Sequence, residues 1–89
     1  MKKKYLSDEK IDYVISLYSK GQIKDTLNEI HKLNERDLLS GVLLNIQGAC
    51  YNNLGLNEKA SISYKAAIGL EPNSPVLYYN LGNTHKELN

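Results

Sequence analysis

Residues 48–72, GACYNNLGLNEKASISYKAAIGLEP, decide the fold of this chain. The apolar and small residues in this stretch recur at three- and four-residue steps, which is the spacing of one face of an α-helix. Gly55 divides the stretch and Pro72 closes it, so we predict a helix, a turn and a second helix. The pattern returns at Gly82, and we call the step from Gly48 to Gly82 the repeat interval. Such an interval predicts a repeat architecture rather than one compact core.

The composition limits the class of protein. A chain of 89 residues allows one domain with a thin core, and its 42% hydrophobic and 24% charged residues argue against disorder. A net charge of +1 gives no electrostatic drive toward nucleic acid or an anionic membrane, so neither is expected as a partner. Because no apolar run is long enough for a signal peptide or a membrane span, we expect a cytoplasmic protein. Residues 1–6, with three consecutive lysines, are expected to form a flexible basic tail.

The residues that carry catalysis or hold metals do not cluster in this sequence. Cys50 is the single cysteine and is expected to be a buried structural thiol. His31 and His85 lie far apart and have no cysteine or carboxylate at ligand spacing, so no metal site is predicted. No phosphate-binding loop or nucleophile elbow is present either, and we expect a protein that is not an enzyme and takes no cofactor.

Five helices are predicted, joined within each pair by turns too short for anything but antiparallel neighbours. Their expected positions are the Ser7 cap to Ser19-Lys20-Gly21, about Gln22 to Asn34, about Gly41 to Asn53, Asn57 to the residue before Glu71-Pro72, and Ser74-Pro75 onward. Ser40, Asn57 and Ser74 are expected to act as N-caps, because their side-chain oxygens can accept hydrogen bonds from the orphan amides of the first turn.

Each helix is expected to bury one apolar face. The inward residues are predicted to be Ile11, Val14, Ile15 and Tyr18, widened by Tyr13 and Leu17, on the first helix, and Ile23, Leu27, Ile30 and Leu33 on the second. Gly48 costs roughly 1 kcal/mol against alanine inside a helix, so a partner helix is expected to approach it closely through Ala60 or Tyr64. On the last helix Leu77, Tyr78, Leu81 and Leu88 are expected to form an exposed apolar face, which further repeats or self-association would cover.

These spacings resemble the tetratricopeptide repeat (TPR) family, whose pattern is W-x2-L-G-x2-Y…A-x3-F…A…P. The residues that carry the resemblance, and that it marks as structural repeat residues, are Leu44, Gly48, Tyr51, Ala60, Tyr64, Ala67, Pro72 and Gly82. Leu44 stands where the family has tryptophan. The resemblance implies an all-α, TPR-type superhelix of two antiparallel helical hairpins plus one additional helix. Residues 7–40 would be a degenerate first repeat, 41–74 a full repeat, and 75–89 the first helix of an incomplete third.

The first repeat departs from the family pattern at its small positions. Val14 replaces the glycine, Thr26 the alanine and Leu38 the proline. A terminal repeat has no neighbour on one side and tolerates such changes.

The resemblance also implies a binding groove lined by the first helix of each hairpin. The groove residues would be Asp12, Ile15, Tyr18, Asn45, Ala49, Asn52, Asn53, Tyr79, Asn80, Asn83 and Lys86. Asparagine both donates and accepts hydrogen bonds, which suits an extended peptide backbone, whereas the alternative is a solvated helix face. Asn80 is similar to an asparagine that recurs in the array of O-linked N-acetylglucosamine transferase, but Ile46 and Asp12 break that ladder here. The carboxylate clamp of chaperone-binding TPR domains is not expected, because Ile11 and Ile15 stand where it needs polar groups.

Two functions follow from the resemblance. The first is a non-catalytic scaffold that binds a peptide or a helix of a protein partner in the groove. The alternative is a substrate-presenting or oligomerising amino-terminal segment of a larger protein, since the repeats are similar to arrays that precede sulfotransferase or glycosyltransferase domains in some bacterial proteins.

Overall fold

A computed structural model describes residues 7–36 and 40–88, and all of the regular structure in these two segments is helical. The predicted basic tail and Leu38 lie outside them. The elements are α1 (Asp8–Ser19), α2 (Ile23–Glu35), α3 (Gly41–Asn53), α4 (Asn57–Leu70) and α5 (Pro75–Leu88). Within the described segments, no helix combines the length and the apolar character needed to cross a membrane.

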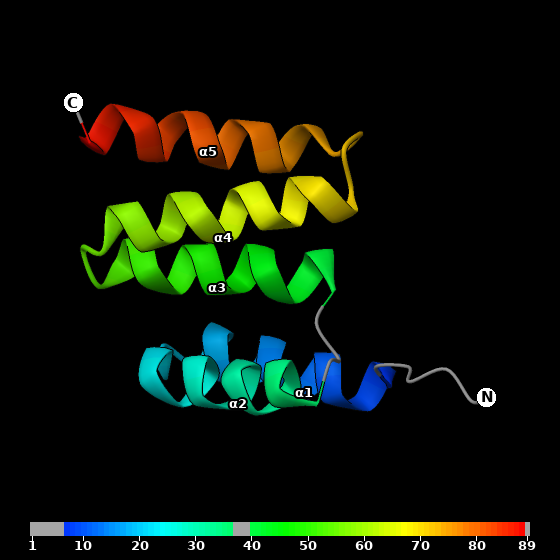
Figure 1. The fold of residues 1–89 in the computed structure, drawn as a ribbon. Coiled ribbons are helices and arrows are strands. Elements are labelled where there is room, and N and C mark those ends of the chain that lie inside the picture. The colour runs from blue at the N-terminus through cyan, green and yellow to red at the C-terminus, as the bar shows by residue number, and fades with distance from the viewer. Residues whose placement is uncertain (1–6, 37–39, 89) are drawn as a thin grey trace.

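The helices stack as hairpins. Helices α1 and α2 form one antiparallel pair, α3 and α4 form the second, and α5 lies along α4 at the far end of the stack (Figure 1). Between the hairpins, α3 contacts both α1 and α2. This arrangement confirms the predicted TPR-type fold of two hairpins and one additional helix.

The two hairpins turn in the same way. Gly21 and Gly55, which are one repeat interval apart, both adopt the left-handed conformation, with φ of 77° and 75°. The residue after each glycine donates a backbone hydrogen bond to the preceding helix, from Gln22 to Leu17 at 3.0 Å and from Leu56 to Tyr51 at 2.8 Å.

Two of the predicted N-caps are confirmed and one is wrong, while the cap at Ser74 stays a prediction. Ser7 and Ser40 accept hydrogen bonds from the amides of Lys10 and Leu43, both at 3.3 Å, as expected for N-caps. The predicted cap at Asn57 is wrong, because Leu56 holds the N-cap position and makes no side-chain capping bond. The reason is the turn at Gly55, which brings the chain into helical geometry one residue early, so that Asn57 is already the first residue of α4.

The closest approach between helices is at Gly48. A Cβ atom at this position would lie 2.6 Å from Cε1 of the Tyr64 ring, a separation that real Cβ contacts do not show. Tyr64 is 2% exposed and shares a core cluster with Ala60 and Ala67. Gly48 therefore has the packing role expected of it, and the residue that fills the space is Tyr64.

A second buried set faces the preceding hairpin. Leu43 joins the core cluster of Val14 and Ile30, and Leu77, at the equivalent position of the next repeat, joins the cluster of Ala60 and Tyr64. The prediction that Leu77 and Leu81 belong to an exposed face is therefore wrong, because Leu77 is 2% exposed and the half-buried Leu81 packs against the same cluster.

The apolar face of α1 is narrower than predicted. Val14 and Leu17 are buried, but Tyr13 and Ile15 are 53% and 40% exposed. Since α1 packs mainly on α2 and α3 among the described helices, it has too few neighbours to cover a broad stripe.

Two glycines at the same repeat position give a matched test of this packing. Gly48→Ala should lower the free energy of unfolding by about 1–3 kcal/mol, because the new methyl group collides with Tyr64. Gly82→Ala should raise it by about 0.5–1 kcal/mol, because nothing lies within 4 Å of that methyl position and alanine restricts the unfolded chain. Urea unfolding followed by circular dichroism measures both. Equal destabilisation by the two changes would contradict the asymmetry.

Candidate functional site

Helices α1, α3 and α5 present a common side that side-chain hydrogen bonds join. Asn53 donates to the hydroxyl of Tyr18 on α1 at 3.5 Å, and Asn80 on α5 donates to the side-chain oxygen of Asn45 at 2.9 Å. We call this side the α1–α3–α5 face. Four of the residues that the resemblance marked as groove-lining meet there: Tyr18, Asn45, Asn53 and Asn80. Asp12, Ile15, Asn53, Tyr79, Asn83 and Lys86 are exposed, whereas Tyr18, Asn45, Ala49, Asn52 and Asn80 are half-buried.

Some of the donors and acceptors of the asparagine side chains on this face are already hydrogen-bonded within the protein. The bond between Asn45 and Asn80 takes one acceptor and one donor, so that each side chain keeps its other polar group for a ligand. Asn53 also bonds to the backbone oxygen of Ala49 at 2.9 Å. These amides hold neighbouring helices in register, which the sequence reasoning did not foresee.

Asn52 points into the stack rather than out of it. Its amide nitrogen donates to the hydroxyl of Thr84 at 3.0 Å and lies 3.4 Å from the hydroxyl of Tyr64. Beside this network is a hollow of about 390 Å³. It is lined by Asn52, Gly55, Asn57, Asn83, Thr84 and Glu87.

Two exposed valines extend the face, and the sequence reasoning missed them. Val42 and Val76 are 42% and 53% exposed, and they stand near the start of α3 and of α5, one repeat interval apart. Each lies three residues before a predicted groove residue, Asn45 or Tyr79, and therefore on the same side of its helix. The repeat interval itself was the signal that would have found them.

The centre of the face carries no charge. Helix α3 contains no Asp, Glu, Lys, Arg or His, and α5 has none before His85. The charged members of the predicted set, Asp12 and Lys86, belong to the two outer helices.

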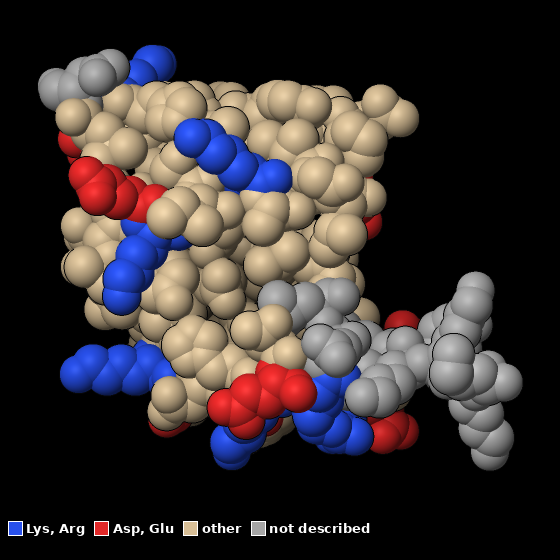
Figure 2. All heavy atoms as spheres, viewed as in Figure 1, with Lys and Arg blue, Asp and Glu red and all other residues tan. Residues whose placement is uncertain are grey.

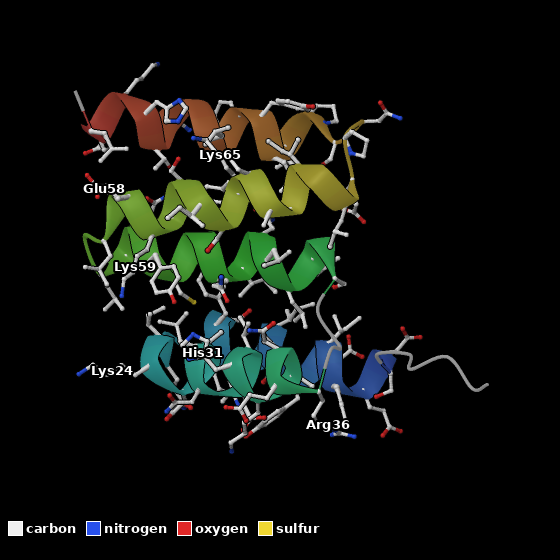
Figure 3. All side chains as sticks on the ribbon, viewed as in Figure 1. Lys24, His31, Arg36, Glu58, Lys59 and Lys65 are labelled. Atoms are coloured by element: carbon white, nitrogen blue, oxygen red, sulfur yellow. The ribbon has the colours of Figure 1, made fainter. Side chains whose placement is uncertain are left out.

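Cys50, His31 and Lys59 make structural contacts away from this face. Burial raises the pKa of the Cys50 thiol to about 11, which keeps it protonated and unreactive near neutral pH. His31 points from α2 toward α3, where its Nε2 lies 3.3 Å from the hydroxyl of Tyr51 (Figure 3). Lys59 covers the same tyrosine, with its Nζ 5.8 Å from the ring centroid. In the described segments, no three His, Cys, Asp or Glu side chains come together as a metal site would require.

Comparison with known families supports the repeat assignment. The family model described as TPR repeat matches residues 48–89, slightly less than half of the chain. Neither the search of curated proteins nor the search of solved structures gave a match. The match covers the segment in which Gly48, Ala60 and Tyr64 pack together. The similarity to arrays that precede transferase domains stays a prediction, because the match concerns the repeat alone.

The Asn45–Asn80 bond can be tested by a double-mutant cycle. Asn45→Ala and Asn80→Ala should each lower the free energy of unfolding, and their coupling energy should be about 0.5–1.5 kcal/mol, since the bond is partly buried. Asn83→Ala is the control, because this side chain is exposed, and its effect should stay within about 0.5 kcal/mol. Denaturant unfolding measures each of these variants. Strictly additive effects of Asn45→Ala and Asn80→Ala would show that the bond does not form in solution.

Proposed function

We propose that this chain is a protein-interaction module whose α1–α3–α5 face binds an extended, uncharged peptide segment of a protein partner. TPR repeats are interaction modules, and the match to residues 48–89 supports that class for this chain. The observation that carries the finer proposal is the combination of a charge-free α3 with a row of exposed apolar side chains beside it.

The apolar row supplies the contact area. Ile15, Val42, Val76 and Tyr79 are between 40% and 69% exposed and lie on the three helices of the face. Burying such side chains against a partner contributes about 25 cal/mol for each Å² of apolar surface. Tyr79 is the most exposed of them, and its ring with a polar hydroxyl is of the kind enriched at interaction hot spots.

The amides supply orientation. Asn45 and Asn80 are bonded to each other and therefore held in place, and both keep a polar group for the backbone of a bound segment. Asn83 is exposed on α5 one turn away from Asn80. Hydrogen bonds to the backbone of a bound peptide do not depend on its side chains. The apolar row would therefore determine which peptide sequences bind.

A peptide selection tests this proposal. Random peptides displayed on phage and selected against the folded chain should yield uncharged sequences with apolar side chains. Tyr79→Ala should weaken binding of a selected peptide by about tenfold or more, since a hot-spot truncation costs about 2 kcal/mol. The matched control is Ile62→Ala, which removes a side chain with 68% exposure from α4. It should leave the affinity unchanged.

Two further outcomes would count against the peptide proposal. The affinity should be nearly independent of salt, because no ion pair is formed at the centre of the face, and a steep loss with added salt would indicate a charged site instead. Normal affinity in a variant with both Asn80→Ala and Asn83→Ala would exclude the amides from recognition.

The same chain offers a second contact surface along α5, through which we propose self-association. Tyr78 and Leu88 are 51% and 43% exposed, and the position of a Cβ on Gly82 has no atom within 4 Å. The surface over α4 and α5 is mostly uncharged in the view of Figure 2, while charges gather over the first hairpin and along one edge. Lys65 on α4 lies over this surface, near α5 (Figure 3).

Light scattering over a range of concentrations measures self-association. The chain, of 10.0 kDa, should form dimers as its concentration rises toward about 1 mM, the range expected of a small interface. Gly82→Glu should keep it monomeric, because a carboxylate on the open face must be desolvated in the dimer. A wild-type protein that stays monomeric throughout would refute this contact.

A further inference from the structure

The two helices of the first hairpin pack against each other through different residues from those of the second hairpin. Val14 and Ile30 hold the places in the first hairpin that Gly48 and Tyr64 hold in the second. Gly48 admits the Tyr64 ring to contact distance, whereas Val14 places a branched side chain at the equivalent position, and α1 and α2 pack less extensively than α3 and α4. An open cleft of about 500 Å³ lies between α1 and α2, within the size range of small-molecule sites.

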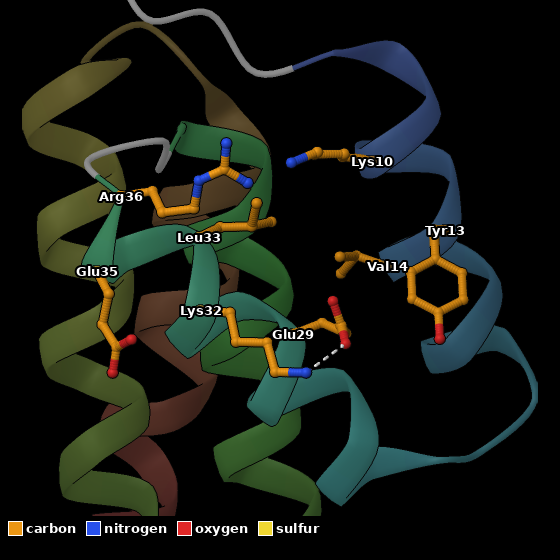
Figure 4. A pocket seen from close by; sticks show the side chains of 8 residues that line it. All are labelled: Lys10, Tyr13, Val14, Glu29, Lys32, Leu33, Glu35 and Arg36. Atoms are coloured by element: carbon orange, nitrogen blue, oxygen red, sulfur yellow. Dashed lines mark hydrogen bonds and ion pairs between the residues drawn. The ribbon is translucent and has the colours of Figure 1, made fainter.

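The floor of this α1–α2 cleft is apolar, and the ion pair of Glu29 and Lys32 lies along one side of the cleft. Val14 and Leu33 line its base and are 1% and 5% exposed, so that they join the cleft to the hydrophobic core. The ring of Tyr13, which is 53% exposed, forms one wall (Figure 4). The aliphatic stems of Lys10 and Arg36 add apolar surface above the base. The apolar part of a small molecule bound in this cleft would therefore be in contact with the protein on several sides.

The mouth of the cleft is cationic. Lys10 on α1 and Arg36 after α2 extend toward one another across it (Figure 4). Lys32 is already neutralised by Glu29, whose carboxylate lies 3.3 Å from its ammonium nitrogen, and Glu35 points away from the mouth. In residues 7–36 and 40–88 the ion pair of Lys32 and Glu29 is the one that forms, so neither Lys10 nor Arg36 has a described carboxylate within ion-pair distance.

Two like charges that converge above an apolar base repel each other, and a monoanion between them would relieve that repulsion. The guanidinium of Arg36 is planar and matches a carboxylate with two parallel hydrogen bonds, while the ammonium of Lys10 adds a third donor. We propose that the α1–α2 cleft binds a small monocarboxylate with an apolar body, of the aliphatic or aryl acid type. The carboxylate lies between Lys10 and Arg36, and the body packs between Tyr13 and Leu33. This site is separate from the α1–α3–α5 face, and its existence does not depend on the peptide proposal.

Titration with octanoate, followed by the backbone amide signals of the isotopically labelled chain, tests the proposal. Saturable shifts should map to α1 between Lys10 and Val14 and to α2 between Glu29 and Arg36. Octanamide, which has the same body without the charge, should bind more weakly by about tenfold or more, since a charge-assisted hydrogen bond is lost. Inorganic phosphate, which has charge without the body, should give no saturable shift at these residues.

A pair of double variants separates the site from general electrostatics. Lys10→Gln with Arg36→Gln should weaken octanoate binding by about tenfold or more. Lys24→Gln with Lys65→Gln removes the same net charge at exposed positions that do not line the cleft and should leave binding unchanged. All four substitutions are at positions outside the hydrophobic clusters, and circular dichroism verifies that both proteins fold.

The single variant Arg36→Gln gives an independent reading, because it should lose part of the affinity while the shifts stay on the same amides. Equal binding of octanoate and octanamide, equal losses in the two double variants, or shifts confined to α3 and α5 would each overturn the proposal.

Discussion

The contact between Gly48 and the ring of Tyr64 is the constraint on which the rest of the stack depends. It sets the distance between α3 and α4, and the buried ring then forms part of the surface on which Leu77 of α5 packs. The hydroxyl of the same ring lies 3.4 Å from the amide nitrogen of Asn52, which itself bonds to Thr84. The Tyr64 side chain thus connects three helices, through van der Waals contact along one edge of its ring and through hydrogen bonds near its hydroxyl.

In the first hairpin, different residues fill the space between the two helices. Its core pairs Val14 with Ile30 and Leu33, so aliphatic side chains fill the space that a ring fills in the second hairpin. Thr26 replaces the buried alanine, and its hydroxyl is satisfied by the backbone oxygen of Gln22 at 2.6 Å. Val14 and Thr26, which depart from the family pattern, are therefore buried like the residues they replace, and a cleft lies between α1 and α2.

The sequence was sufficient for the fold because the decisive signals are local and periodic. The repeat interval, the two glycines of the turns and the serine caps at Ser7 and Ser40 were each interpreted correctly. The interval predicts which residues face inward, but not which neighbour they meet. For this reason the spacing alone predicts an open face for Leu77, whereas the side chain packs on α4.

The candidate binding face was harder to predict for the same reason. The choice of Asn45 and Asn80 as face residues followed from spacing, whereas their bond to each other depends on how α5 is rotated against α3, a tertiary quantity. Val42 and Val76 do not stand out in the sequence, because an apolar residue in a helix is ordinarily expected to be buried, and the structure shows both exposed. Asn57 was mistaken for a cap because propensity ignores where the preceding turn ends.

The burial of Leu43 and Leu77 against the hairpin that precedes each of them has a consequence for biosynthesis. When such a helix emerges from the ribosome, the preceding hairpin has already been synthesised. The helix can therefore pack on that hairpin before any later segment is made. Contacts between sequence neighbours also make this ordering fast. The polypeptide is therefore suited to acquire its native shape progressively, hairpin upon hairpin, while translation is still under way.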